Sequence, residues 1–455
     1  MVNIVDVIYA MAVLVGALVV GYLFVQLPLI RKSFLPASVA AGLFLLIMGP
    51  ELLGKVSAQS SIGFDMYAIW APLPGILISA IFASLFLARP IISLKGMWKL
   101  AAPQAAFGQM IAWGYYMIGG LVTLCITIPF FGARPLSAAL LEISFEGGHG
   151  TAAGMIPVFE EFYYQSAHQM AIALATTSLL ATLVCGLLLI QYGKKRKLIG
   201  DYGPIEEIKG MIYHRRVIHE LHKRGVSLRE QLGFMNIISH ILLIVVSIFF
   251  GWVLHSLLLF IEVITWGQND VKIFGYMPLF TFCMFGGILA QSLWRKMKIT
   301  ISRPLVDLMS GIILSILVAS AIATMKLGFV AEDGMTFLFL ALAGIIWVIF
   351  SFLVMARFMF RKHWFANAIV SVGQSMGTTA TGLLFGKIVD PKDRTGVVES
   401  FGYKQLMFAP LVGGGVVTAL AIPMIILMGL PAFTIACGLI CLTWGLIGVV
   451  FFHPR

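Results

Sequence analysis

Two short polar segments interrupt an otherwise apolar chain, and they occupy matching places in its two halves. Segments 144–154 and 373–382 each hold a Gly-Thr step followed by small residues and a further glycine. The step begins at Gly150 in one and at Gly377 in the other, an offset of 227 in a chain of 455 residues. Because lipid offers the backbone no hydrogen-bond partner, polar non-helical segments at membrane depth must lie inside protein or beside a wet cavity. A matched pair indicates the binding site of a secondary transporter built from inverted repeats.

The residue types in these segments suit an anion and a cation. Glycines expose backbone, interrupted helices offer free N–H and C=O groups, and hydroxyls both donate and accept. Free N–H groups favour a carboxylate, and free carbonyls favour Na⁺. The predicted substrate-binding residues are Ser144, Gly147, Gly148, His149, Gly150, Thr151, Gln374, Ser375, Gly377, Thr378 and Thr379. The predicted cation-binding residues are Glu146, Thr381 and Asp307.

Each of these residue types also has a structural interpretation. Glycines let helices pack closely, and a threonine hydroxyl can bond to its own helix. Glu146 can lie in water at the mouth of its segment, and Asp307 can simply pair with Arg303. Glu146 and His149 are three residues apart, which alone is too few ligands for a metal site. We therefore interpret them as a pair in which Glu146 orients His149 as a donor to substrate, and we expect no cofactor and no metal beyond Na⁺.

Composition places the chain in a membrane. Hydrophobic residues make up 60% and charged residues 11%, whereas soluble domains are about 25% charged. Many apolar runs reach the roughly 20 residues that cross a bilayer. The predicted spans are 4–29, 35–53, 68–88, 105–131, 168–192, 233–261, 273–293, 304–326, 335–358, 402–428 and 432–452. Two polar hairpins, near 136–160 and 364–388, complete an all-α polytopic protein.

Charge predicts the orientation. With the N-terminus outside and the C-terminus in the cytoplasm, 27 of the 31 lysines and arginines fall in cytoplasmic loops, as expected for a protein of the cell's inner membrane. The net charge of +11 therefore does not indicate nucleic-acid binding. The two hairpins then enter from opposite faces, which makes the halves inverted repeats. No span is expected to hold an arginine or lysine at mid-membrane.

This topology divides the chain into four parts. We expect an N-terminal repeat at 1–193, a basic cytoplasmic linker at 194–231, a C-terminal repeat at 232–428, and an additional helix with a short tail at 429–455. The basic run at the start of the linker either fixes topology, the favoured interpretation, or binds anionic membrane lipid.

The chain resembles the bacterial sodium/glutamate symporter family over residues 1 to about 428. The motif of that family in the first hairpin reads Gly147-Gly148-His149-Gly150-Thr151. The start of the second span is similar to another family segment and reads Pro36-Ala37-Ser38-Val39-Ala40-Ala41-Gly42. A third similar segment ahead of the third span reads Phe64-Asp65-Met66. The chain departs from the family at Glu146, where members that carry glutamate often place serine.

The resemblance implies a sodium-coupled carrier of L-glutamate or a related anion, with two five-helix inverted repeats and re-entrant hairpins. It also implies a homodimer whose transport domains move like elevators. The protein is expected not to be an enzyme, because Ser144, Glu146 and His149 alone make a weak hydrolytic site. A sodium- or proton-coupled carrier of another organic anion and a channel with two re-entrant loops remain as alternatives.

Overall fold

The computed structural model describes residues 4–31, 34–56, 66–88, 94–199, 233–267, 273–297, 299–391, 395–408 and 410–452, and within these ranges the chain forms helices and no strand. Eight helices there are long and apolar enough to cross a membrane. They are Ile4–Val25, Met66–Ser84, Ala101–Phe131, Gln165–Lys195, Phe234–Ile264, Arg303–Ala323, Phe329–Met359 and Leu430–Phe452. The protein is thus an all-α, multi-pass membrane protein, as its composition predicts.

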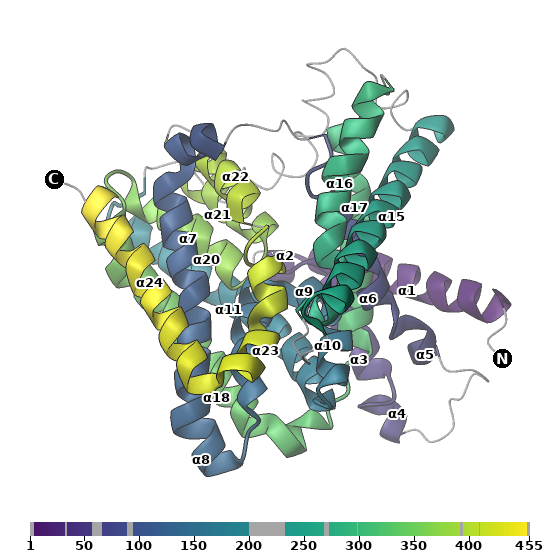
Figure 1. The fold of residues 1–455 in the computed structure, drawn as a ribbon, viewed down its shortest axis with the longest axis horizontal. Helices are drawn as coiled ribbons and strands as arrows, with labels where there is room; N and C mark the ends of the chain where they lie inside the picture. The colour runs from purple at the N-terminus through teal and green to yellow at the C-terminus, as the bar shows by residue number, and fades with distance from the viewer. Residues whose placement is uncertain are drawn as a thin grey trace.

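One group of helices gathers the early spans of both halves, on the right of Figure 1. Its members are α1 (Ile4–Val25), α3 (Ala37–Met48), α5 (Met66–Trp70), α6 (Leu73–Ser84), α15 (Phe234–Ile264), α16 (Leu279–Lys296) and α17 (Arg303–Ala323). Helix α1 packs on α3, α3 on α17, and α6 on both α16 and α17, while α15 packs along α16. Short helices α2 (Pro28–Arg31), α4 (Leu53–Val56) and η5 (Phe274–Tyr276) lie in the connections.

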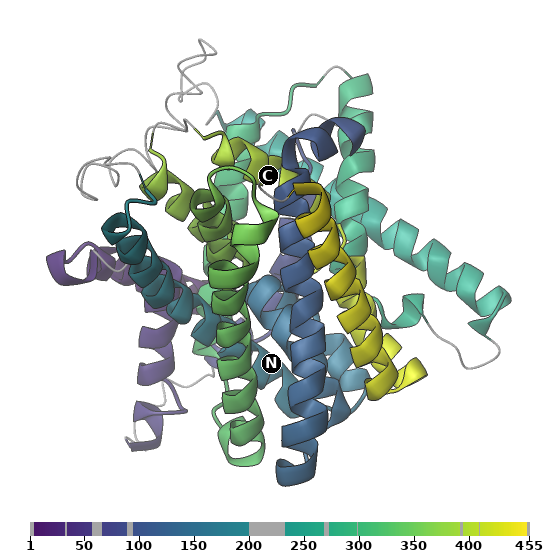
Figure 2. The ribbon, with the colours of Figure 1, turned by 90° about the vertical axis from the view of Figure 1, so that its left-hand side faces the viewer.

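A second group gathers the later spans. Its members are α7 (Leu94–Val122), α11 (Gln165–Lys195), α18 (Phe329–Phe350), α22 (Val397–Phe408), α23 (Val416–Met428) and α24 (Leu430–Phe452). Helix α7 packs against α18, α22 and α24, and the last of these lies beside it in Figure 2. Helices α7 and α18 each continue through a π-helical turn, into η1 (Thr123–Thr127) with α8 (Ile128–Phe131) and into η6 (Ser351–Met355) with α19 (Ala356–Met359).

Short helices form over the residues of both predicted hairpins, and re-entry of these segments into the membrane stays a prediction. The first consists of η2 (Pro135–Ala139), the π-helical turn η3 (Glu142–Glu146), α9 (Gly148–Gly154) and α10 (Ile156–Glu161). The second consists of α20 (Trp364–Ser375) and α21 (Thr379–Val389), which pack on one another. Helix α9 contacts α6 and α17 on one side and α11 on the other, so the first hairpin lies between the two groups.

The outer helices carry apolar side chains on their exposed faces. Ile4 on α1 is 74% exposed, Phe234 on α15 is 76% exposed, and Val450 on α24 is 71% exposed. Helices α1 and α24 lie at opposite edges of the molecule (Figure 1). Large exposed apolar surfaces at both edges are consistent with contact with lipid.

The predicted continuous span 402–428 is wrong, because the chain is interrupted between α22 and α23. Gly413 and Gly414 adopt positive φ angles of 71° and 102°, a conformation that glycine tolerates without steric cost. Pro410, which has no N–H to donate, accepts a hydrogen bond at its carbonyl from the Val416 N–H. The break turns the Gly413 N–H toward Glu142 of the first hairpin instead of using it within a helix.

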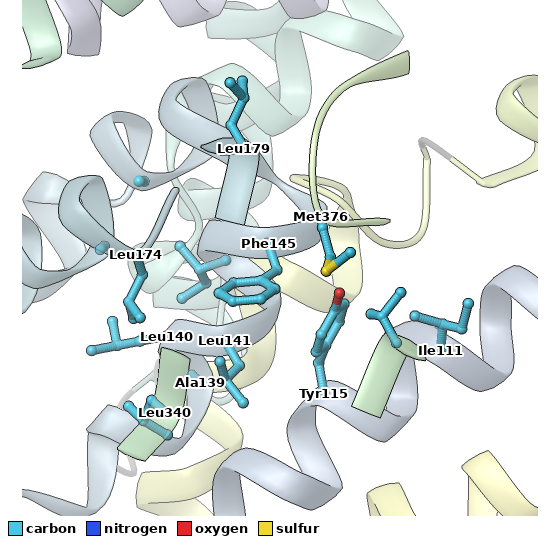
Figure 3. Packing of buried hydrophobic residues seen from close by; sticks show 14 of the residues in the cluster. Ile111, Tyr115, Ala139, Leu140, Leu141, Phe145, Leu174, Leu179, Leu340 and Met376 are labelled. Carbon is cyan, nitrogen blue, oxygen red and sulfur yellow. The ribbon is translucent and has the colours of Figure 1, made fainter. Parts of the chain in front are cut away.

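The largest hydrophobic cluster joins the two hairpins to α7. In Figure 3 Phe145 of the first hairpin and Met376 at the tip of the second face Tyr115 of α7, and all three are fully buried. The Tyr115 and Phe145 rings meet edge to face, with 5.4 Å between their centroids. The Tyr115 hydroxyl donates to the Ser375 carbonyl at 2.7 Å, so the second hairpin is held by its backbone as well as by packing.

Some predicted boundaries lie outside the described residues. Helix α11 ends at Lys195, close to the predicted start of the linker, but residues 200–232 are not described. The segment containing Phe64 and Asp65 is not described either. The division into two repeats, a linker and an extra helix stays a prediction.

Close packing of α15 on α16 depends on glycines. A Cβ added to Gly286 would lie 2.1 Å from the Ser247 carbonyl oxygen and 2.5 Å from the Gly251 nitrogen. Because both neighbours are backbone atoms, Gly286→Ala should lower stability by about 1–3 kcal/mol through overpacking. Gly311→Ala is the matched control, since nothing lies within 4 Å of its added Cβ. Thermal unfolding in detergent checks the pair, and equal melting temperatures would contradict the close contact.

Candidate functional site

Two buried carboxyl groups lie on one turn of the first hairpin. Glu142 is 0% and Glu146 is 7% exposed. Both belong to the π-helical turn η3, in which the Gly147 N–H donates to the Glu142 carbonyl at 3.0 Å. Turns of this type occur often at functional sites. Ionisable groups buried in a membrane protein are costly and indicate function unless they are fully paired.

Glu142 is fully hydrogen-bonded. Its Oε2 accepts from the Tyr116 hydroxyl at 2.6 Å. Its Oε1 accepts from the Gly413 N–H at 2.7 Å and from the Thr418 hydroxyl at 2.9 Å. Thr418 in turn accepts from the Gly414 N–H at 3.0 Å. The break between α22 and α23 therefore supplies donors that attach the C-terminal helices to the first hairpin.

Glu146 is connected to the second hairpin and to a lysine. Its Oε1 accepts a hydrogen bond from the Gln374 amide nitrogen, and the Gln374 amide oxygen accepts from the Lys404 ammonium at 2.5 Å. Gln374 is 4% and Lys404 is 0% exposed. The Glu146 Oε2 has no hydrogen-bond partner in the part of the chain that the structure describes. The chain Glu146–Gln374–Lys404, which we call the buried relay, crosses between the tips of the two hairpins.

Lys404, which the sequence places among the basic residues of the cytoplasmic loops, is buried inside the bundle. Lys404 belongs to α22 and lies against α7, where a Cβ added to Gly108 would meet its Cε at 2.5 Å. Its ammonium is 3.9 Å from the centroid of the Phe408 ring, within the range of a cation–π interaction. The position of Lys404 near the end of an apolar span made it look like a cytoplasmic loop residue. The signals missed in the sequence were Glu142 in an apolar run and Lys404 between aromatic residues.

The interpretation of Glu146 and His149 as a pair is wrong, because the two side chains have different partners. The His149 Nε2 and the Thr176 Oγ1 on α11 share a hydrogen bond of 3.0 Å. Glu146 is bonded to Gln374 instead. The left-handed conformation of Gly148, with φ of 69°, separates the π-helical turn from α9 and so breaks the helical spacing that would place them together.

Of the predicted threonines, Thr151, Thr378 and Thr381 are bonded within their own segments, whereas Thr379 is bonded to α22. The Thr151 hydroxyl donates to the Gly147 carbonyl at 3.0 Å. Thr378 caps α21, where its hydroxyl accepts from the Thr381 N–H at 3.2 Å and bonds to the Thr381 hydroxyl at 3.0 Å. The Thr379 hydroxyl accepts from the Gln405 amide at 2.8 Å. The structure therefore places Thr378, Thr379 and Thr381 together at the start of α21.

The serine hydroxyls of the two segments have the most unused hydrogen-bonding capacity for a further ligand. Ser144 and Ser375 are both 0% exposed, and neither hydroxyl has a hydrogen-bond partner among the described residues. The Ser375 side chain lies next to the Glu146 carboxyl. Together with the free oxygen of Glu146, the Ser375 hydroxyl offers an oxygen atom that a cation prefers.

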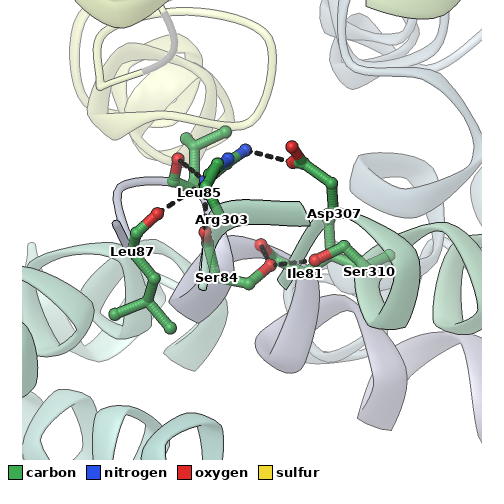
Figure 4. Close-up of polar contacts among 7 residues, drawn as sticks. All are labelled: Ile81, Ser84, Leu85, Leu87, Arg303, Asp307 and Ser310. Carbon is green, nitrogen blue, oxygen red and sulfur yellow. Dashed lines mark hydrogen bonds and ion pairs between the residues drawn. The ribbon is translucent and has the colours of Figure 1, made fainter. Parts of the chain in front are cut away.

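Asp307 belongs to a separate cluster near the C-terminal end of α6. It pairs with Arg303 at 2.5 Å, and its side chain is 54% exposed. Arg303 also donates to the carbonyls of Ser84, Leu85 and Leu87, as Figure 4 shows. The geometry agrees with the simple ion-pair interpretation, and a cation-binding role of Asp307 stays a prediction.

A cavity of about 360 Å³ opens elsewhere, where α10 and the starts of α11 and α18 meet. Phe159, His168, Lys326 and Glu332 are among its lining residues, and none of the lining residues belongs to the buried relay. Within the described ranges, no three His, Cys, Asp or Glu side chains gather to hold a metal ion. The buried relay is therefore the more specific candidate site.

Comparison with known families decides the class of protein. Residues 3–389 match the sodium/glutamate symporter family. The chain belongs to the sodium/glutamate symporter family. No curated protein matches the chain. The family is one of transporters, so sodium and glutamate are the solutes that membership implies. The match ends at the last residue of α21, and Lys404, Gly413 and Thr418 therefore lie beyond the matched residues.

The hydrogen bonds of Glu142 predict a stability effect in this symporter-family protein. Thr418→Val keeps the side-chain shape but removes one donor to the buried carboxyl and one acceptor for the Gly414 N–H. We expect a loss of about 1–3 kcal/mol, because buried polar groups are left without partners. Thr443→Val is the matched control, since its hydroxyl is exposed and, among the described residues, bonds only to the Leu439 carbonyl. Equal thermal stability of the two variants would contradict this role.

Proposed function

We propose that the protein is a sodium-coupled importer of glutamate or a similar anionic amino acid, and that it works by alternating access of the elevator type. In this proposal the two hairpins are re-entrant and approach from opposite faces of the inner membrane. The N-terminus lies outside, the C-terminus lies in the cytoplasm, and the working unit is a homodimer. Family membership supports sodium-coupled glutamate transport.

The contact between the hairpin tips is the observation that carries this proposal. The hydrogen bond from Gln374 to Glu146 joins residues 228 positions apart, one on each hairpin. Binding sites of transporters with inverted repeats lie where the interrupted helices of the two repeats meet. The unpartnered hydroxyl of Ser375 lies at this meeting point. These features support a solute and ion site between the tips.

The grouping of helices supports the repeat. The first group takes three early spans from each half, with α1, α3 and α6 beside α15, α16 and α17. The second group takes the later helix and hairpin elements of each half. Such a division suits an elevator mechanism, in which one group of helices moves against the other while the site moves with it. The first hairpin lies between the groups, so a movement of one group against the other would change its contacts.

Uptake of labelled L-glutamate into proteoliposomes tests the function. An inward Na⁺ gradient should drive saturable accumulation, and a K⁺ or choline gradient should not. Flux that rises linearly with concentration and ignores Na⁺ would support a channel, and uptake driven by a proton gradient or of another organic anion alone would support the alternative carriers. Labelling of single introduced cysteines from each face tests the opposed hairpins, and the same accessibility for both tips would contradict them.

The membrane potential tests how many ions move. Glutamate with a single Na⁺ carries no net charge, whereas each additional Na⁺ adds about 2.3 kcal/mol of driving force per 100 mV. With more than one Na⁺ per glutamate, an inside-negative potential should raise accumulation at a constant sodium gradient. Valinomycin with a K⁺ gradient sets the potential for this measurement, and accumulation independent of potential would indicate an electroneutral cycle.

The N-cap of α21 predicts a transport phenotype in the second hairpin. Thr378→Ala removes the cap and a hydroxyl at the proposed substrate site, and loss of such a cap costs about 0.5–2 kcal/mol. We expect lower sodium-driven uptake with unchanged abundance in the membrane. Thr378→Ser keeps the capping oxygen and should retain most of the uptake. Wild-type uptake by the alanine variant would contradict a role of the second hairpin tip in transport.

A further inference from the structure

We propose that Lys404 is a tethered cation that competes with the coupling sodium ion for Glu146, so that Na⁺ binds by displacing the lysine from the buried relay. This inference rests on the proposed function, but it concerns a residue beyond the part of the chain that matches the family. The site would take a monovalent cation, with the Glu146 carboxylate and the Ser375 hydroxyl as ligands.

The geometry leaves one side of Glu146 open to a ligand. Its Oε1 is occupied by Gln374, whereas its Oε2 is buried and has no hydrogen-bond partner in the described ranges. The Ser375 hydroxyl lies next to this carboxyl and has no other hydrogen-bond partner among the described residues. A buried carboxylate oxygen without a partner is costly. Two such oxygen atoms side by side suit a hard cation, which prefers oxygen ligands.

The charges of Glu142, Glu146 and Lys404 also favour the binding of a cation. Two carboxyl groups, Glu142 and Glu146, are buried close enough to interact electrostatically, and Lys404 is the ammonium that interacts with Glu146. When both carboxyl groups are ionised, Lys404 compensates only one of the two negative charges. Tyr116, Thr418 and the Gly413 N–H stabilise Glu142 with dipoles but add no charge. Lys404 can compensate only one carboxylate at a time, so a monovalent cation beside Glu146 would take over the lysine's role there and lower the cost of burying that charge.

The Lys404 ammonium can leave the buried relay because other groups nearby can hold it. It reaches Glu146 only through Gln374, and no ion pair within 4 Å between the two is described. The Phe408 ring lies 3.9 Å from the ammonium and the Phe401 ring 5.6 Å. These aromatic faces can hold the ammonium when the relay opens, because a desolvated cation is attracted to the face of an aromatic ring. Na⁺ and the lysine would thus alternate as the counter-charge of Glu146.

Competition makes a quantitative prediction for sodium binding. If the relay is closed in about nine of ten molecules, the apparent sodium affinity is reduced about tenfold, because only the open fraction binds. Lys404→Met removes the ammonium while keeping an unbranched side chain in the same space. It should therefore bind Na⁺ about tenfold more tightly than the wild type. A merely structural lysine predicts the reverse, since its loss would loosen the site and weaken binding.

The test is a sodium titration of the purified full-length protein in nanodiscs without glutamate. Tryptophan fluorescence or thermal stability reports binding, with choline replacing Na⁺ at constant ionic strength. Titrations at about pH 7 and about pH 8.5 separate proton binding at Glu146 from loss of the site. Lys404→Met should bind more tightly than the wild type at about pH 7, where the lysine is charged, and by a smaller factor at about pH 8.5, and Lys404→Arg should not. Glu146→Gln should lose the sodium response.

Two controls make the outcome decisive. Lys387→Met removes a partly buried ammonium on α21 and should leave sodium affinity unchanged. Glu146→Gln with Lys404→Met replaces both charges by neutral groups and should remain folded yet not respond to Na⁺. Equal or weaker sodium binding by Lys404→Met at both pH values, with wild-type uptake intact, overturns the role of Lys404 alone. A wild type without sodium response and without glutamate uptake overturns the proposed function as well.

Discussion

The burial of charge inside an apolar bundle is the constraint on which the rest of this structure depends. Glu142, Glu146 and Lys404 are all nine-tenths or more buried, and a charge in such surroundings persists only when it is paired or hydrogen-bonded. Their partners come from α7, the second hairpin and the break between α22 and α23. Satisfying three side chains therefore brings together segments from both halves of the chain.

The broken helix and the π-helical turn are consequences of that constraint. A continuous helix across 409–415 would use its N–H groups internally, whereas the interrupted one presents the Gly413 N–H to Glu142 and the Gly414 N–H to Thr418. The π-helical turn that holds both glutamates continues into a left-handed Gly148. Local strain and lost helical bonds are offset by polar groups that are satisfied at the centre of the protein.

In the proposed function, a site built on such a network would couple ion to substrate through charge. The hairpin tips meet at Gln374 and Glu146, and the same amide bonds to Lys404. A cation that enters beside Glu146 changes the charge available to a neighbouring anion without moving any helix. Coupling then follows from electrostatics at short range in a low dielectric, where the interaction of two charges is far stronger than in water. In the proposed alternating access, the helical groups on either side would only have to change which face of the membrane reaches the site.

The motif residues Gly147 to Thr151 pointed to the family, and composition and periodicity determined the fold class and most of the spans. These follow from sequence because the bilayer constrains length and polarity locally. The partners of Glu146 and His149, the burial of Lys404 and the break within 402–428 were decided only by the tertiary structure. Each depends on which distant segment supplies a hydrogen bond, and Gln374 lies 228 residues from Glu146. The sequence looks the same whether a lysine in an apolar helix lies at the membrane interface or is buried. Only its neighbours in space distinguish the two cases.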